Sequence, residues 1–285
     1  MLSGGVVKSV EGFGTTFRNM NMGELRIHGH SRIVPAWSGA LNMAADEWLL
    51  ERAVHDHVAT LRFYTWGTPT VSLGHFQAGR VQGETRPDAE RGFEGVPQCF
   101  LELPWVRRLS GGGAILHHHE LTYSCALPSG HPLAREPRDL YGVVHAALVD
   151  FLKGVGVDAG LRGRGDSERD GNFLCFSRGD PQDIVVGPHK VVGSAQRRRK
   201  GAVLQHGSLL LERSRFAPEF PGIRDLGAPD LSLEGTLQVL SDRLGGLLAG
   251  AEGDLVPEQF HEEDLRQIEA LAAGYVVHLE REPQD

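Results

Sequence analysis

Apolar positions along the chain follow two different spacings, and each spacing predicts one type of element. Apolar residues three or four positions apart indicate helices, because such residues share one helical face. This spacing occurs in four segments, at 40–58, 138–152, 237–247 and 265–271. The last two segments give the C-terminal fifth of the chain a helical character.

Short apolar runs broken by Gly and Pro predict strands. Runs of this type lie at 61–66, 70–73, 106–109, 114–116, 121–127, 173–176, 183–186, 191–195 and 202–211. Run 121–127 alternates less regularly, which is typical of a strand near a sheet edge or an active site. The helices do not alternate with the strands in a regular rhythm, so the pattern favours an α+β fold with a mixed, largely antiparallel sheet flanked by helices.

The pattern also divides the chain into three regions. Residues 1–23 are glycine-rich and lack periodicity, so we expect a disordered leader there. Residues 24–230 contain all the predicted strands, and we expect one domain from them. Residues 231–285 are predicted to form a helical extension that packs on this domain.

Composition and charge exclude several classes of protein. The chain has 37 acidic and 29 basic residues, and the resulting formal charge of −8 disfavours nucleic-acid binding. No apolar stretch reaches the roughly 18 residues of a membrane span, and the N-terminus lacks a secretory signal. Three cysteines without CxxC spacing predict neither a disulfide framework nor a zinc site. We therefore expect a cytoplasmic globular protein.

The triple histidine His117, His118 and His119 has the appearance of a metal site. On a strand, however, neighbouring side chains face opposite sides, so His118 is expected to point away from the other two. No acidic residue or cysteine stands at a supporting spacing. We therefore expect no metal here.

Three segments have the residue types of a substrate site. The first, at 107–113 (RRLSGGG), combines two arginines with a glycine run. Glycines let backbone N–H groups approach a ligand closely, and the arginines would neutralise an anionic group. A tight strand connection with a solvated arginine pair explains the segment equally well.

The second and third segments contain a lysine and a cysteine. Lys190 precedes the small-residue run 193–196 (GSAQ), where it would place an ammonium beside a polar substrate group, although a solvated surface lysine is the commoner explanation. Cys175 follows the charged segment 161–170, and such a cysteine is usually a buried structural thiol. A lysine close by would instead favour the thiolate, and so a nucleophile.

Two long blocks of sequence resemble the biotin/lipoate protein ligase and lipoyltransferase family. They are RRLSGGGAILHHHELTYS at 107–124 and KVVGSAQRRRKGAVLQHGSLLL at 190–211, and shorter matches at 42–47, 61–64 and 71–77 extend the resemblance over most of the chain. The resemblance implies that residues 24–230 are a catalytic domain with a mixed sheet, related to class II aminoacyl-tRNA synthetases and biotin synthetases. It also implies the attachment of octanoyl or lipoyl groups to a lysine of lipoyl-domain proteins.

The family contains two chemistries. LipM-type octanoyltransferases take octanoyl from acyl carrier protein through a cysteine thioester and need no cofactor. ATP-dependent ligases use ATP and Mg²⁺ to make an acyl-adenylate and hold it with the lysine that matches Lys190. The transferase is favoured because Cys175 falls where that type carries its nucleophile and because 117–124 (HHHELTYS) resembles its motif. Two departures are His118-His119, in place of an acidic pair, and Gly113, in place of an arginine.

The resemblance to the transferases implies roles for individual residues. Cys175 is expected to be the nucleophile, and Lys190 the cation that activates it and stabilises the oxyanion. The expected substrate-binding residues are Arg107, Arg108, Ser110, Gly111, Gly112, Gly113, His117, Gly193, Ser194, Ala195, Gln196 and His206. Residues 71–74 and the glycine run are expected to wall a tunnel for the octanoyl chain.

The expected partners are two kinds of protein. Acyl carrier protein is the expected donor, and the expected acceptors are lipoyl-domain proteins such as the glycine cleavage H protein and the acyltransferase subunits of 2-oxoacid dehydrogenases. Both kinds are typically acidic, so the basic run 197–200 is a candidate docking surface. A solvated hairpin turn explains this run equally well.

Three other functions stay open beside the octanoyltransferase. They are an octanoyl amidotransferase acting between lipoyl domains, an ATP-dependent lipoate ligase in which Cys175 is incidental, and a paralogue that binds lipoyl domains without turnover.

Overall fold

The computed structural model describes residues 24–28, 36–77, 96–163, 174, 179–230, 232–250 and 253–279. The expected leader, residues 1–23, lies outside this part of the chain. So do the expected nucleophile Cys175 and, apart from Leu174, the strand expected at 173–176.

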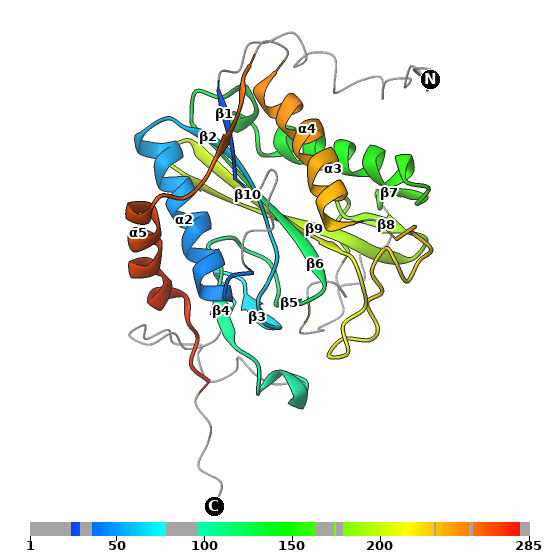
Figure 1. The fold of residues 1–285 in the computed structure, drawn as a ribbon. Helices are drawn as coiled ribbons and strands as arrows, with labels where there is room; N and C mark the ends of the chain where they lie inside the picture. The colour runs from blue at the N-terminus through cyan, green and yellow to red at the C-terminus, as the bar shows by residue number, and fades with distance from the viewer. Residues whose placement is uncertain are drawn as a thin grey trace, which may run out of the picture.

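A mixed eight-stranded sheet runs through the centre of the molecule (Figure 1), in the order β11-β1-β2-β6-β10-β9-β8-β7. Strand β1 pairs in parallel with β2 and β11, and all other neighbours in this sheet pair antiparallel. The predicted fold class is therefore confirmed. The strands are β1 (Leu25–His28), β2 (Ala59–Tyr64), β6 (Glu120–Leu127), β7 (Ala159–Leu161), β8 (Ile184–Val186), β9 (His189–Arg199), β10 (Ala202–Leu210) and β11 (Leu255–Glu258).

A second, three-stranded sheet has the order β4-β3-β5. Its strands are β3 (Thr70–Leu73), β4 (Trp105–Arg107) and β5 (Ile115–His117). Strand β5 continues through a short turn at residues 118 and 119 into β6, so the two sheets adjoin there. Strand β6 is paired on both sides and entirely buried, so its irregular pattern does not come from an edge position.

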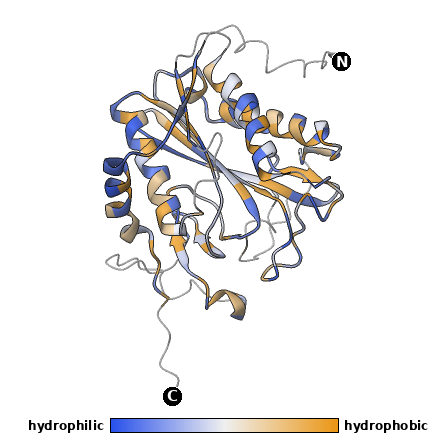
Figure 2. Cartoon of the chain, viewed as in Figure 1, coloured by the Kyte–Doolittle hydropathy of each residue, from blue (hydrophilic) through white to orange (hydrophobic). Residues whose placement is uncertain are grey.

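Helices cover both faces of the large sheet (Figure 1). On one face lie α2 (Gly39–His55) and α5 (Glu262–Ala272), and on the other lie α3 (Pro137–Gly154) and α4 (Leu233–Ala249). Short 3₁₀ turns occur at Gln98–Phe100, Pro132–Ala134 and Ala273–Tyr275. Figure 2 shows hydrophobic and hydrophilic residues on both the strands and the helices. None of the described helices is long and apolar enough to cross a membrane.

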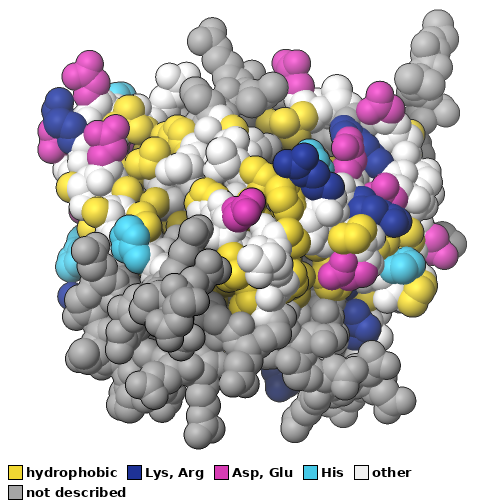
Figure 3. Space-filling model, turned by 90° about the horizontal axis from the view of Figure 1, so that it is seen from below, with side chains coloured by type: hydrophobic (Ala, Val, Ile, Leu, Met, Phe, Trp, Pro, Cys, Tyr) yellow, Lys and Arg dark blue, Asp and Glu magenta, His cyan; other side chains and the backbone are white. Residues whose placement is uncertain are grey.

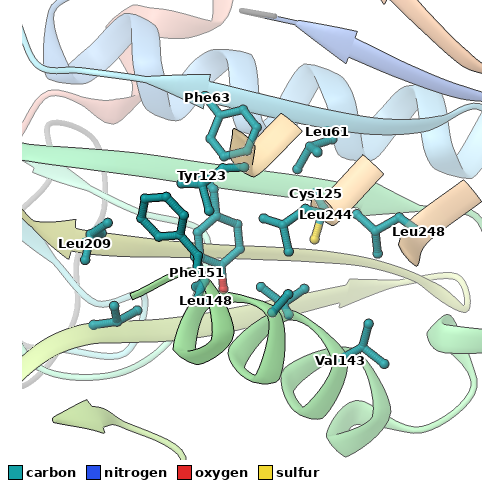
Figure 4. Close-up of a cluster of buried hydrophobic side chains, with 14 of the residues drawn as sticks. Leu61, Phe63, Tyr123, Cys125, Val143, Leu148, Phe151, Leu209, Leu244 and Leu248 are labelled. Carbon is teal, nitrogen blue, oxygen red and sulfur yellow. The ribbon is translucent and has the colours of Figure 1, made fainter. Parts of the chain in front are cut away.

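The alternation of side chains along β6 divides the core between the two faces. Tyr123 and Cys125 pack with α3 and α4 (Figure 4), whereas Ala126 packs with α2. In Figure 4, leucines and aromatic rings from β2, β6 and β10 meet Val143, Leu148 and Phe151 of α3. Burial raises the pKa of the Cys125 thiol to about 12, so this cysteine is an inert part of the core.

The helices begin at residues whose side chains satisfy free backbone N–H groups. Ser38 accepts a hydrogen bond from the Leu41 N–H before α2, and Ser232 accepts one from the Gly235 N–H before α4. His261 and Asp264 form a reciprocal capping box at the start of α5. Helix α3 has no side-chain cap and begins with a proline, Pro137. All four predicted helices are present, with boundaries within a few residues of the expected ones.

Three short strands, β1, β7 and β11, were not predicted. Each has only three or four residues, too few for a pattern to stand out. Strand β11 lies between α4 and α5, so the C-terminal region adds a strand to the large sheet as well as two helices.

A half-buried ionic cluster attaches β11 to β1 and α2. The Glu258 carboxylate accepts hydrogen bonds from Arg26, at 2.6 Å, and Arg52, at 3.1 Å, and lies 3.0 Å from the His28 ring. Burial by itself would raise the pKa of Glu258, but the hydrogen bonds from His28 and Arg26 lower it to about 2. The ring of His28 in turn stacks on Phe260 at 4.3 Å.

We expect Glu258→Gln to lower the free energy of unfolding by about 1–2 kcal/mol near neutral pH, after allowance for solvent screening at this sheet edge. Because the folded-state pKa is about 2 and the ordinary value is 4.5, the contribution is present above 4.5 and lost as the pH falls towards 2. Urea unfolding of both proteins at about pH 7 and about pH 3 tests this. The difference between them should shrink at the lower pH, and an equal difference at both would contradict the role of Glu258.

Candidate active site

A cavity of about 530 Å³, part of it open to solvent, lies where the two sheets meet. Residues from α2, β2, β5, β6, β9, β10 and the glycine run line it. Nine of the predicted site residues are among them, namely Arg108, Gly111, Gly112, His117, Lys190, Gly193, Ser194, Ala195 and His206. Arg107, Ser110, Gly113 and Gln196 do not line the cavity, although Ser110 bonds to a residue that does.

The two arginines support the backbone of the site. Both are buried, so the alternative of a solvated pair is wrong. Arg107 donates to the carbonyls of Gly74 and Gln77, at 3.0 and 2.6 Å. Arg108 donates to the carbonyls of Gly111 and Gly113, at 2.8 and 2.7 Å. Arg108 thereby holds the glycine run in its conformation, and Arg107 holds the backbone that follows β3. The expected neutralisation of an anionic ligand by these arginines stays a prediction.

The backbone of the glycine run packs closely against the backbone at the end of β3. Gly112 has a φ of 97°, which favours glycine. A Cβ atom on Gly74 would overlap the carbonyl oxygen of Gly112. The expectation that residues 71–74 wall the cavity is wrong, since Val71 and Leu73 point into a separate apolar core.

A buried hydrogen-bonded chain joins α2, β10 and the loop after β4. His206 donates from Nδ1 to Asp46, at 2.9 Å, and its Nε2 lies 2.5 Å from the Ser110 hydroxyl. Asp46 also accepts from Arg62 and Tyr64, at 3.2 and 3.0 Å. Burial opposes ionisation here, but the His206 hydrogen bond and the charges of His206 and Arg62 hold the pKa of Asp46 below its usual value. Since both ring nitrogens of His206 have buried partners, the ring fastens the loop to the sheet.

A second buried hydrogen-bonded network of the same type is centred on His117. Its Nδ1 donates to Glu120 and its Nε2 contacts the Ser72 hydroxyl, both at 2.8 Å. Its ring stacks on Trp66, with centroids 3.8 Å apart. The charge and hydrogen bond of His117 lower the pKa of Glu120 against the opposing effect of burial. Trp66 also lines the cavity, together with Met43, Tyr64 and Ile115, and these side chains supply an apolar wall.

The other two histidines of the triplet depart from the expected strand geometry. Strand β5 ends at His117, and the rings of His118 and His119 stack on each other at 3.5 Å instead of facing opposite sides. His118 contacts the Ser214 hydroxyl at 3.0 Å. No group of three or more potential metal ligands comes together within the described ranges.

Ser194, which lines the cavity, belongs to a network of hydrogen bonds with defined donors and acceptors. Its hydroxyl lies 2.7 Å from both the Tyr123 hydroxyl and Nε2 of His145. Nδ1 of His145 donates to the Gln182 carbonyl at 2.6 Å, so in the neutral ring Nε2 accepts the Ser194 proton. Burial lowers the pKa of His145 to about 4, which keeps the ring neutral at pH 7.

Lys190 is buried on the cavity wall, where its Nζ donates to Asp183 at 2.8 Å. The surface-lysine alternative is therefore wrong. Gly193 makes room for this side chain, because a Cβ atom there would lie 2.6 Å from Cε of Lys190.

Sequence reasoning missed most of the acidic partners in this site. Those that it missed are Asp46, Glu120 and Asp183, together with the histidine His145. Asp183 and His145 lie outside the segments that resemble the family and carry no spacing signal of their own. For Asp46 and Glu120 a signal did exist, since both fall inside segments that resemble the family.

We expect the His145 imidazole to stay neutral down to about pH 4. Because the folded-state pKa lies below the ordinary 6.5, stability should fall as the pH drops from about 6.5 towards 4. Nitrogen-15 NMR of the histidine rings measures the titration, and the His145→Ala variant identifies the signal. A midpoint near the ordinary value would contradict the buried, neutral assignment.

The fold and the site together define a class of protein. An apolar wall, a buried ammonium and a close-packed glycine run suit the binding of an acyl group. The family model of the lipoyl protein ligase A/B catalytic domain matches residues 38–216, more than half of the chain. The chain belongs to this family, as its two motif blocks indicated.

Several relatives are similar over most of their length. Octanoyltransferase LipM of Brevibacillus brevis is 30% identical over 268 residues, which cover 84% of this chain and 92% of that protein. Octanoyltransferase LipM of Bacillus anthracis is 31% identical over 264 residues, which cover 82% and 90%.

Solved structures share the fold at lower identity. A lipoate-protein ligase A bound with ATP superposes with a TM-score of 0.62 at 21% identity, covering 88% of this chain and 94% of that one. A bipartite lipoate protein ligase from Thermoplasma acidophilum gives a TM-score of 0.56 at 19% identity, covering 89% and 92%.

Proposed function

We propose that this chain is an octanoyltransferase that moves an octanoyl group from acyl carrier protein to a lipoyl-domain lysine through a thioester on Cys175. Similarity to its relatives shows that the chain is an acyltransferase. The name of these relatives, octanoyltransferase, supports octanoyl as the group transferred. The observation that carries the proposal is the buried Lys190 ammonium on the wall of a cavity with an apolar side.

Two described residues support Cys175 as the nucleophile. Leu174, which precedes it in the chain, forms a parallel bridge with Ala114, directly after the glycine run. Cys125 is unsuitable because burial raises its pKa to about 12. The remaining cysteine, Cys99, lies on the surface and contacts the Phe216 carbonyl.

The proposed reaction has two acyl transfers. In the first, the Cys175 thiolate attacks the donor thioester, a new C–S bond forms, and the carrier thiolate leaves. In the second, the acceptor amine attacks the enzyme thioester, the C–N bond forms, and the amine proton passes to the departing thiolate. Each step develops an oxyanion, which the Lys190 ammonium would stabilise. Since thiol exchange keeps the acyl group activated, the proposal includes no cofactor.

The apolar wall would hold the octanoyl chain. Met43, Trp66 and Ile115 present hydrophobic surface, and each CH₂ group of a buried chain contributes about 0.8 kcal/mol to binding. This contribution favours a medium-length acyl group over a shorter one.

The basic run 197–200 offers less charge to partners than the sequence suggested. Arg198 donates to the carbonyls of Ala134 and Arg135, and Arg199 pairs with Glu47 and Glu51. Lys200 and Gly201 both have positive φ and form the turn between β9 and β10, so the hairpin-turn alternative describes the segment. On the face in Figure 3, Lys and Arg side chains are interspersed with Asp and Glu. Docking of lipoyl domains and of acyl carrier protein remains part of the proposal.

Intact-protein mass spectrometry tests the reaction. The protein mixed with octanoyl-acyl carrier protein, without ATP, should gain one octanoyl group on Cys175 and discharge it onto a lipoyl domain. Cys175→Ser should reduce transfer by roughly 10³-fold or more with an unchanged thermal melt. An active serine variant would contradict the nucleophile assignment.

The same experiment addresses the ligase alternative, which the triple glycine at 111–113 favours. Absence of an adduct, combined with modification of the lipoyl domain that requires ATP and lipoate, would identify a ligase in which Cys175 is incidental.

We expect Lys190→Ala to slow alkylation of Cys175 by roughly threefold to tenfold near neutral pH, because a nearby cation favours the thiolate. Lys153→Ala is the matched control, since Lys153 is exposed at the end of α3. Iodoacetamide labelling followed by peptide mass spectrometry gives the rates. Equal rates in the wild type and Lys190→Ala would show that Lys190 does not activate the thiol.

A further inference from the structure

The proposed reaction leaves a second cavity of the molecule unused. This cavity has a volume of about 380 Å³, part of it open to solvent. Its apolar lining includes Leu116, Leu210 and Ala217, and its polar lining includes His118, His119 and Ser214. A cavity with both apolar and hydrogen-bonding sides suits a ligand of mixed polarity.

Two strands place this second cavity next to the acyl cavity. On β5, Ile115 and His117 line the acyl cavity, whereas Leu116 between them lines the second one. Side chains alternate along a strand, so the two cavities lie on opposite sides of β5. On β10, Ser208 lines the acyl cavity and Leu210, about 7 Å further along the strand, lines the second. Strand β5 is at the edge of its three-stranded sheet, so only one strand separates the two cavities there.

Imidazole and hydroxyl groups form the polar wall of the second cavity. Nδ1 of His118 lies 3.0 Å from the Ser214 hydroxyl, and the His118 ring stacks on that of His119 at 3.5 Å. Burial, followed by the charges of His119 and Arg215, lowers the pKa of His118. The ring is therefore neutral at pH 7, and it has one nitrogen that donates a hydrogen bond and one that accepts.

Arg215 brings a positive charge to the rim of this cavity. Its guanidinium lies 4.7 Å from the centroid of the Phe216 ring, and that ring lies 5.9 Å from the His118 ring. No carboxylate in the described part of the chain forms an ion pair with Arg215. The acidic residue that lines the cavity, Glu212, is paired with Arg224 instead. The rim is therefore suited to an anionic group.

These groups match one part of the proposed donor. An acyl carrier protein holds its acyl group on a phosphopantetheine arm, which runs from the thioester sulfur through amide groups and a dimethyl group to a phosphate. Leu116, Leu210 and Ala217 offer an apolar surface to the methyl groups. The Ser214 hydroxyl and the His118 ring match the amides, and the cationic rim matches the phosphate.

A donor thioester also requires two adjacent sites. The acyl chain extends from one side of the thioester group and the arm from the other, so only the acyl part enters the acyl cavity. The arm has to lie against a neighbouring surface of the protein. The second cavity is such a surface, because it shares β5 and β10 with the first.

We propose that the second cavity binds the phosphopantetheine arm of the acyl donor and that His119 and Arg215 hold the phosphate of the arm. This site rests on the proposed function, because it assumes that a carrier protein delivers the acyl group. No bond forms or breaks in it. It distinguishes an acyl group on a carrier from a free fatty acid, which has no arm.

Binding of the bare arm tests the site without any acyl transfer. In an NMR titration, 4′-phosphopantetheine should shift the ring signals of His118 and His119, which the variants His118→Asn and His119→Asn identify. Arg215→Ala and His119→Ala should each weaken binding by roughly threefold to fivefold, the usual size for an exposed contact of this type. Arg266→Ala is the matched control, because Arg266 is an exposed arginine on α5 that lines neither cavity, and it should leave binding unchanged.

Two further ligands show which part of the arm is recognised. Pantetheine, which lacks the phosphate, should bind more weakly than the whole arm, and Arg215→Ala should not change its affinity. Inorganic phosphate should bind about tenfold more weakly than the whole arm, since it makes no apolar contacts. If phosphate alone binds as tightly as the arm, the site recognises a free anion and the proposal is wrong.

Ala217→Leu fills the second cavity without changing a charge. Ala217 is only 4% exposed and lines the cavity, so a longer side chain should occupy the space of the arm and abolish its binding. Ala273→Leu, at an exposed position after α5, is the control. A folded Ala217→Leu protein, verified by its thermal melt, that binds the arm as tightly as the wild type would contradict the site. If this variant does not fold, the variants of the exposed Arg215 and His119 decide.

Kinetics connect the site to the proposed reaction. With octanoyl-4′-phosphopantetheine as the donor, Arg215→Ala should raise KM by about fivefold at an unchanged kcat. Octanoyl-N-acetylcysteamine is a thioester without the dimethyl group and the phosphate. With this donor, the variant and the wild type should have the same kcat/KM.

These measurements separate the site from the reaction. If no transfer occurs but 4′-phosphopantetheine binds and its affinity depends on Arg215 and His119, the proposed reaction is wrong and the arm site stands. If transfer occurs but these variants change neither the binding of the arm nor KM, the site is overturned. Weaker binding of the lipoyl domain alone would assign this surface to the acceptor and would also overturn the site.

Discussion

A buried carboxylate, Asp46, ties together the elements that surround the cavity. It lies on α2 and accepts hydrogen bonds from Arg62 and Tyr64 of β2 and from His206 of β10. Through His206 it also reaches Ser110, in the loop that leads into the glycine run. Arg62 is almost completely buried, so removal of Asp46 would leave an uncompensated charge at a cost of about 3–5 kcal/mol. The ionised carboxylate therefore helps to hold helix, sheet and loop in their relative positions.

The same principle explains the rest of the site. Glu120 collects donors from His117, Thr122 and Ser208, and Asp183 holds Lys190. Each buried acid has a basic or hydroxyl partner, and most of these partners line the cavity. Because desolvated polar groups lose much free energy without partners, the network specifies one arrangement of the cavity wall. That arrangement suits acyl transfer, in which a fixed positive charge must stand near a developing oxyanion.

Local sequence patterns predicted the regular elements well where they were long or sharply bounded. Strand β3 was predicted to the residue, and α2, α3, α4 and α5 were all present. The pattern also located β6, predicted at 121–127 and present at Glu120–Leu127, but its alternation is irregular because Thr122 and Ser124 lie in a strand at the centre of the sheet. Polar residues inside a central strand weaken its alternation, and the sequence does not reveal that Glu120 and Asp46 satisfy them.

The candidate site, like the fold, was predictable from the sequence only in part. The sequence alone indicated the glycine run and the lysine before a small-residue run. Each of these motifs consists of residues that are close together along the chain. The bonds of Arg107 to the Gly74 and Gln77 carbonyls and of Arg108 to the Ser72 carbonyl were not readable, because they join residues 30 to 36 positions apart along the chain. The pairing of His206 with Asp46 spans 160 positions along the chain. Local sequence thus pointed to the glycine run and the lysine that line the cavity. Contacts between distant segments set their hydrogen-bond partners, since a buried polar group depends on whichever partner the fold places beside it.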